Sequence, residues 1–148
     1  MADADPVFAR RAAVVDICRD AATGVIDRVV GEASRALSGF GLGRDAASRY
    51  AEGIRAVMPL VWEAMSLPDG SEREAKLAAL AAQIRGVSEH NHIPRLVERG
   101  LVAIAVRLAR DVVRRRAANH GFVPEDLERE FVAFADRLED RLFEERTD

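Results

Sequence analysis

The stretch LVAIAVRLARDVV, residues 101–113, is apolar on nearly every side of a helix and is interrupted only by Arg107, Arg110 and Asp111. In a folded protein, a helix that is apolar on most of its faces is surrounded by other elements. The helical pattern extends beyond this stretch in both directions, and a run of arginines followed by a glycine marks its end. The sequence therefore predicts a helix over residues 94–119 at the centre of an all-α bundle.

Turn signals and apolar stripes divide the rest of the chain into further helices, for a total of five to six. Asp5 and Pro6 form a good helix start, and the glycines within residues 39–43 end this first helix. A second helix begins near Arg44 and ends in a turn that contains proline and glycine. Pro59 lies in its middle and removes one backbone hydrogen bond, which predicts a kink or a break into two short helices.

Local signals also describe the later helices. Residues 71–74, SERE, fit a capping box that opens a third helix, and Pro124 with the acidic residues after it opens the last one. Gly24 and Gly31 lie seven residues apart in the first helix, on nearly one face. We expect them to mark a close helix–helix contact; a bend, or a ligand lying against the backbone, is the alternative.

Composition limits the fold class. The chain has 148 residues, of which 49% are hydrophobic and only 5% aromatic. A chain of this length buries about 70% of its unfolded surface as one domain. Runs of alternating apolar and polar residues, which half-buried strands require, are absent. We therefore expect a single helical domain over residues 1–148, of which a globin-like arrangement is one form.

Charge distribution excludes several classes of partner. The formal net charge of −3 argues against a nucleic-acid partner, because such binding needs a dominant positive field. No stretch reaches the roughly 18 apolar residues of a membrane span, and charges interrupt the N-terminus where a signal peptide would be apolar. Lys76 is the only lysine, an arginine bias typical of GC-rich bacterial genomes. The expectation is a bacterial cytoplasmic protein without a membrane partner.

Residues that commonly bind metals are sparse. His90 and His92 lie in an expected loop, and His120 ends a different helix. A metal site needs three or four ligands and supporting hydrogen bonds, and the paired Glu-x-x-His motifs of di-iron bundles are absent. Cys18 is the only cysteine, so no intramolecular disulfide can form. We expect polar loop and capping roles for the histidines, with no metal and no cofactor; a histidine that binds haem or metal is the alternative.

Arg107, Arg110 and Arg114 share one face of the predicted helix over residues 94–119. Their guanidinium groups could together bind a phosphate or a carboxylate, which makes them a candidate anion site. They also lie toward a helix C-terminus, and the helix that follows is strongly acidic. Interhelical ion pairing is therefore the favoured interpretation, and anion binding is the alternative.

A candidate ligand pocket lies around Pro59. Tyr50, Met58, Trp62 and Met65 are concentrated there on one predicted helix. Such residues most often pack in a core. Soft and aromatic side chains on a kinked helix are also where a bundle opens an apolar pocket.

The last predicted helix carries a narrow apolar seam with spacings of four, three, four and four, close to the pattern of packed helical pairs. The seam consists of Leu127, Phe131, Phe134, Leu138 and Leu142. Val132, Ala135 and Phe143 lie beside it and broaden the apolar surface beyond what one partner helix need cover. We expect these three residues near the interface of a homodimer.

One region resembles a known family. Between Arg107 and Phe143, a long helix ends in RRRAANH, GFVPEDL turns the chain, and an amphipathic helix follows. This sequence pattern is similar to that of the N-terminal helical sensor domains of RsbR-type stressosome co-antagonists and PucR-type bacterial regulators. The resemblance implies a globin-like or related bundle that dimerises and relays a signal to an output domain. It covers about a quarter of the chain and carries over no binding residue.

Two functions from different classes follow from these observations. The first is a non-catalytic regulatory module that senses a small-molecule ligand or a protein partner, dimerises and signals through its last helix. The second is a carrier of a small molecule or haem, with an apolar pocket near Trp62 and a histidine ligand. A small all-α enzyme is a third hypothesis, although no nucleophile–base pair or phosphate-binding glycine loop is recognisable.

Overall fold

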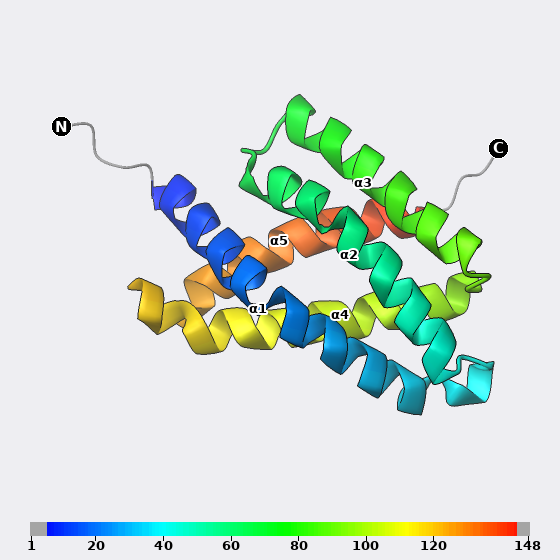
Figure 1. Ribbon diagram of the computed structural model, residues 1–148. Helices are drawn as coiled ribbons and strands as arrows, with labels where there is room; N and C mark the ends of the chain where they lie inside the picture. The colour runs from blue at the N-terminus through cyan, green and yellow to red at the C-terminus, as the bar shows by residue number, and fades with distance from the viewer. Residues whose placement is uncertain (1–5, 145–148) are drawn as a thin grey trace.

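The computed structural model describes residues 6–144, and every regular element within them is helical (Figure 1). The all-α prediction is confirmed. Five α-helices are joined by short turns, and 3-10 helices η1 (Ser38–Phe40) and η2 (Ala117–His120) precede the second and the last of them. The α-helices are α1 (Pro6–Ala36), α2 (Arg44–Ser66), α3 (Ser71–His90), α4 (Arg95–Arg116) and α5 (Pro124–Phe143).

Glycine and proline set most of the helix boundaries, as the sequence predicted. Gly41 and Gly121 adopt left-handed backbone conformations, with φ of 85° and 80°, immediately after η1 and η2. Only glycine adopts this conformation at no steric cost. Pro124 is the first residue of α5 and Pro94 immediately precedes α4. Pro6 is the first residue of α1, while Asp5 lies outside the described residues.

Two details differ from the sequence prediction. Ser71 does not cap α3: the capping position belongs to Gly70, and no side chain caps the helix. Ser71 is already in the first helical turn, so the register is one residue away from a capping box. Helix α2 also continues through Pro59 without breaking into two. The carbonyl of Arg55 loses its usual donor at Pro59, and both residues lie on the exposed side of α2.

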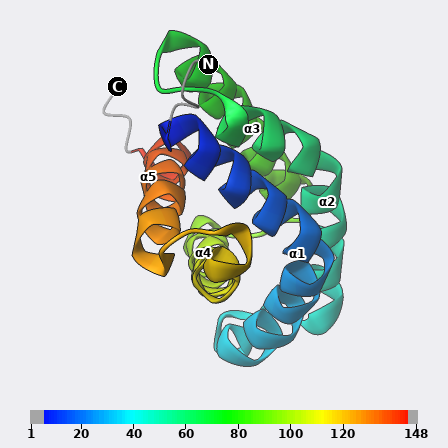
Figure 2. The ribbon, with the colours of Figure 1, turned by 90° about the vertical axis from the view of Figure 1, so that its left-hand side faces the viewer.

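The helices are arranged in a ring. Helix α1 packs on α2, α2 on α3, α3 on α5, α5 on α4, and α4 again on α1. Helix α1 also packs on α5, so each of these two helices has three α-helical neighbours. Figure 2 looks almost along α4 and shows α5 on one side of the molecule and α1 with α2 on the other. The ring places α2 opposite the pair formed by α4 and α5.

Helix α4 shares the centre of the fold with α1. Leu101, Leu108 and Val113 of α4 are fully buried, as expected for a central helix. Its neighbour Ala103 is exposed, and α1 contains more buried residues than α4. Much of the apolar surface of α4 is only partly buried, and most of these partly buried residues line an apolar cavity. Helix α4 is therefore buried against other helices on one side only, and not on nearly all sides as the sequence predicted.

Gly24 and Gly31, which were predicted to lie at a close helix–helix contact, do not lie at one. A Cβ atom built on Gly24 would meet nothing within 4 Å, and one built on Gly31 would meet only an arginine tip. The close approaches are at Gly53, against Val87 of α3, and at Gly100, against Leu37. The prediction for Gly24 and Gly31 is wrong, because this face of α1 points away from the neighbouring helices.

Candidate ligand-binding cavity

An apolar cavity of about 190 Å³ lies between α2 and the pair formed by α4 and α5. Side chains of α1 line it along one side, and Ile84 is the contribution of α3. Protein interiors are packed so closely that few voids exceed the size of a water molecule. An apolar cavity of about 150 Å³ is large enough to bind benzene. The cavity in this protein is therefore large enough for a small apolar molecule.

Helix α2 provides the wall that the sequence singled out. Tyr50, Met58, Trp62 and Met65 all line the cavity. Tyr50, Met58 and Trp62 are separated by eight and four residues, so they follow one another along one face of the helix. Tyr50 and Met65 are buried, whereas Met58 and Trp62 are partly buried. The four residues grouped by sequence thus share one cavity in the fold.

Small residues on the opposite helices create the space. Ala105 and Ala109 are one turn apart on α4, and Ala21 and Ala22 line the cavity from α1. A larger side chain at any of these positions would extend into the volume in front of α2. The cavity exists because these alanine side chains are too small to fill the space between the helices of the ring.

Cys18 lies in the cavity wall, and its thiol is unreactive. Burial raises the pKa of its thiol to about 12. A thiol with such a pKa carries almost no thiolate at neutral pH, and the thiolate is the reactive form. Cys18 therefore acts as a small apolar side chain.

Among the described residues that line the cavity, Glu139 is the only charged one. Burial raises the pKa of its carboxyl group, and the charges of Asp136 and Asp140 raise it further. Arg99 of α4 acts in the opposite direction. The side chain of Glu139, on α5, thus borders a cavity whose surface is almost entirely apolar. Nothing in the sequence distinguishes this residue, because its neighbours are acidic residues typical of a solvated helix face.

A buried polar cluster lies behind Tyr50. Ser88 of α3 donates a hydrogen bond to the carboxylate of Glu98 of α4, and both residues are buried. Burial raises the pKa of Tyr50, the charge of Glu98 raises it further, and a hydrogen bond with Ser88 acts in the opposite direction. The phenol of Tyr50 therefore remains protonated at physiological pH. Its ring belongs to the cavity wall, while its hydroxyl group belongs to this cluster.

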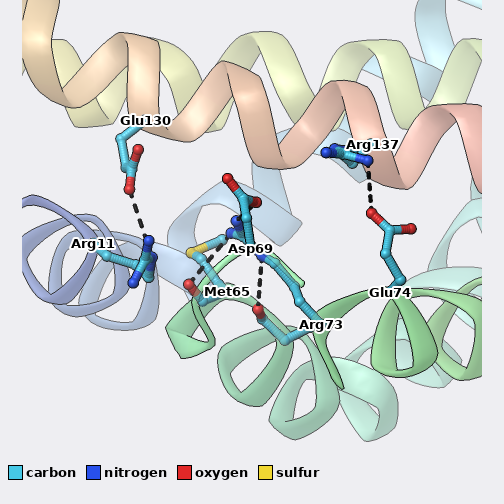
Figure 3. Close-up of polar contacts among 8 residues, drawn as sticks. Arg11, Met65, Asp69, Arg73, Glu74, Glu130 and Arg137 are labelled. Carbon is cyan, nitrogen blue, oxygen red and sulfur yellow. Dashed lines mark hydrogen bonds and ion pairs between the residues drawn. The ribbon is translucent and has the colours of Figure 1, made fainter. Parts of the chain in front are cut away.

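Polar contacts hold α5, which forms another part of the wall, against α1 and α3. Figure 3 shows Arg11 of α1 pointing toward Glu130 of α5, with 3.6 Å between Nε and Oε1. Glu74 of α3 accepts hydrogen bonds from Arg137, at 2.7 Å, and from Arg141, at 2.8 Å. The hydrogen bond from Arg141 is the main reason that the pKa of Glu74 is lowered. Helix α5 is thus tied to the ring at several points along its length.

Arg73 supports the cavity wall from behind. This buried residue donates hydrogen bonds to the carbonyl of Ala64, at 3.2 Å, and to Asp69, at 2.9 Å. Figure 3 shows Arg73 beside Asp69. A cation near the last carbonyls of a helix complements the helix dipole, and here that helix is α2. The Arg73 guanidinium also lies 5.1 Å from the ring centroid of Phe134, which lines the cavity. One side chain therefore connects the end of α2 with the wall on α5.

The three arginines of the candidate anion site all have carboxylate partners. Arg107 pairs with Glu32 of α1. Arg110 and Arg114 pair with Glu128 of α5, at 2.9 and 2.6 Å. Arg110 and Arg114 thus pair with the acidic helix that follows, as the sequence favoured, whereas Arg107 pairs with the first helix. An anion at this site would have to compete with the carboxylates already present.

No histidine lines the cavity, although all three lie within the described residues. His90 borders a separate depression beside Gly53, His92 has a left-handed backbone in the turn before α4, and His120 ends η2. Within residues 6–144, no three side chains of the metal-binding types are grouped to hold an ion. The histidine ligand of the carrier hypothesis is therefore not in the pocket near Trp62.

The residues expected at a dimer interface occupy different environments. The seam of α5 packs inside the subunit, with Leu127 and Leu142 fully buried. Ala135 is also buried and lines the cavity, so it does not belong to an outer surface. Val132 and Phe143 remain partly exposed. The apolar surface on α5 that is left for a partner is smaller than expected, because part of it faces the cavity.

Within residues 6–144, the chain contains no helix that is both long and apolar enough to cross a membrane. Comparisons with family models, with curated proteins and with solved structures gave no match.

Proposed function

We propose that this protein is a non-catalytic bacterial sensor module that binds a small apolar molecule in the cavity between α2 and the α4–α5 pair. The observation that carries the proposal is the cavity itself, about 190 Å³ in volume and lined by Tyr50, Met58, Trp62 and Met65. An apolar cavity of this kind binds apolar molecules, because water gains few hydrogen bonds inside it.

The wall on α5 supports a role in signalling. Phe131, Phe134, Leu138 and Leu142 of this helix line the cavity. A ligand that contacts these side chains stabilises the position of α5 relative to α2. A ligand shifts a conformational equilibrium only through such a difference in contacts between states. Helix α5 is therefore the element through which the bound state is passed on, as in the sensor domains that this chain resembles.

Fluorescence of Trp62 tests ligand binding directly. It is the only tryptophan in the chain, and it lies in the cavity wall. Titration with toluene or 1-octanol should change its emission with a saturable dependence on concentration. The same ligands should raise the melting temperature, because a ligand that binds only the folded state stabilises it.

A cavity-filling variant and a matched control locate the binding site. Ala105→Leu places a larger side chain in the cavity and should abolish the saturable change. Ala103→Leu makes the same substitution on an exposed position of the same helix and should bind like the parent. If Ala105→Leu also binds like the parent, or if neither ligand binds the parent, the proposed function is wrong.

A further inference from the structure

Trp62 of α2 lies between the apolar cavity and a second hollow, an open depression on the surface of the protein. The depression is lined by residues of α1, α2 and α3 and of the turn that joins α2 to α3. Among the described residues, Trp62 is the one that borders both spaces. Its partial burial agrees with a position between an apolar interior and the solvent.

The boundary between the two spaces crosses α1. Val15 and Arg19 border the depression, whereas Cys18 and Ala22 border the cavity. The members of each pair are four residues apart, so each pair lies on one face of the helix. One face of α1 thus belongs to the depression, and the face beside it belongs to the cavity.

The boundary also crosses α2, and there it falls at Trp62. Met58 and Met65 border the cavity, whereas Pro59 and Glu63 border the depression. A rotation of about 100° per residue places Trp62 between these two faces of the helix. The indole therefore forms the wall that separates the two spaces on α2.

The depression could hold part of an apolar chain if the indole were absent. Val15 and Leu67 are apolar side chains in its lining. An ion pair between Lys76 and Glu63, at 3.0 Å, is also part of the lining. A chain that passed Trp62 would thus meet apolar groups together with charged ones, unlike the surface of the cavity.

We propose that Trp62 sets the upper length of the ligand, because its indole closes the cavity on the side of the depression. This inference rests on the proposed function and adds a size limit to the ligand class. Burial of one CH2 group increases affinity about fourfold. This gain should end at the chain length that fills the cavity, since further CH2 groups would have to displace the indole or remain in water.

A series of linear alcohols measures the size limit. Dissociation constants of 1-hexanol, 1-octanol, 1-decanol and 1-dodecanol follow from the rise in melting temperature with alcohol concentration, which does not require Trp62 fluorescence. For the parent, affinity should increase about fourfold per CH2 group from 1-hexanol to 1-octanol. Binding of 1-dodecanol should be no tighter than that of 1-octanol.

Substitutions of Trp62 should move the limit. In Trp62→Ala the two spaces are joined, so affinity should continue to increase up to 1-dodecanol. Trp62→Leu is less disruptive and should move the limit to a longer alcohol even if Trp62→Ala does not fold. Leu138→Ala is the control: it shortens a side chain of the cavity wall that does not border the depression, and the limit should stay within the series.

A further variant distinguishes a connection to the depression from a gain in cavity volume. Leu67→Asp, made in the Trp62→Ala background, places a charge in the depression and outside the cavity. It should weaken binding of 1-dodecanol about tenfold and leave binding of 1-hexanol unchanged, because only the longer chain reaches Leu67.

The outcomes separate this inference from the proposed function. If the affinity of the parent rises through 1-dodecanol, or if the limit is unchanged in both Trp62 variants, Trp62 does not set the ligand length. The same conclusion follows if Leu67→Asp leaves 1-dodecanol binding unchanged. In each case the cavity remains a binding site, whereas failure of toluene and of all four alcohols to bind would refute the proposed function and the size limit with it.

Discussion

The hydroxyl group of Ser88 on α3 donates a hydrogen bond to the carboxylate of Glu98 on α4 at a point where both residues are buried. Tyr50 of α2 joins the same cluster through Ser88. Three helices thus meet through polar groups at a place otherwise surrounded by apolar side chains. A buried charge is costly unless it is hydrogen-bonded, so this cluster favours one arrangement of the three helices.

Removal of the Ser88 hydroxyl should therefore destabilise the protein. Ser88→Ala leaves Glu98 buried without this donor and should lower the free energy of unfolding by about 2 kcal/mol. Urea denaturation measures this change. The double variant Ser88→Ala with Glu98→Leu should recover much of the loss, because no unpaired charge remains. A double variant less stable than Ser88→Ala would contradict this account.

Glycine-to-alanine substitutions should have opposite effects on α1 and α2. Gly24→Ala should stabilise the protein by about 0.5–1 kcal/mol, because alanine is the better helix former and nothing lies within 4 Å of the new Cβ. At Gly53 the new Cβ would lie 2.5 Å from a methyl carbon of Val87. This clash should outweigh the helix preference and destabilise the protein by about 1–3 kcal/mol. Equal changes in the urea midpoints of the two variants would show that the predicted contact is absent.

The helix boundaries and the cavity residues of α2 could be predicted from the sequence, because both depend on interactions between residues close together in the chain. Proline and glycine act on the backbone within a few residues, so the beginning of α5 and the ends of η1 and η2 could be identified. Tyr50, Met58 and Trp62 share one helix face, which depends only on helical periodicity. Both kinds of signal are independent of how distant segments pack.

The remaining features depend on contacts between distant segments. The sequence could not show that Gly53, rather than Gly24, meets a neighbouring helix, since this depends on the orientation of α2 against α3. The apolar surplus of α4 predicted a helix surrounded by others, but a cavity takes up part of this surface. A charged residue between the buried Val97 and Leu101 was the available signal for Glu98. Its partner Ser88 is on another helix, where no spacing rule applies.

Glu139 and Glu74 should influence stability with opposite dependence on pH. The folded-state pKa of Glu139 is raised, so its charged form is less favourable in the folded than in the unfolded protein. Glu139→Gln should therefore raise the melting temperature at pH 7, and this gain should vanish as the pH falls below the usual carboxyl range. The pKa of Glu74 is lowered, so Glu74→Gln should lower the melting temperature at pH 7 and lose this effect at acid pH. Changes of the same sign in both variants at pH 7 would contradict these assignments.

We propose that the homodimer expected from the sequence forms through the outer side of α5. Val132 and Phe143 remain partly exposed after the seam has packed inside the subunit, whereas Ala135 is buried and cannot contribute to such a surface. The Phe143 ring also lies near the guanidinium groups of Arg95 and Arg99, at 6.0 and 4.9 Å from its centroid.

Light scattering of the parent at high micromolar concentration should give twice the chain mass of 16.2 kDa. Val132→Glu combined with Phe143→Glu should shift the mass toward one chain, because two charges would be buried at the interface. Val123→Glu provides the control: Val123 is 57% exposed, precedes α5 and lies outside the expected interface, so this variant should remain dimeric. A parent that is monomeric at this concentration would refute the dimer and leave the apolar surface of α5 to a different protein partner. Loss of the dimer in the control as well would contradict an interface confined to Val132 and Phe143, because it would extend to the start of α5.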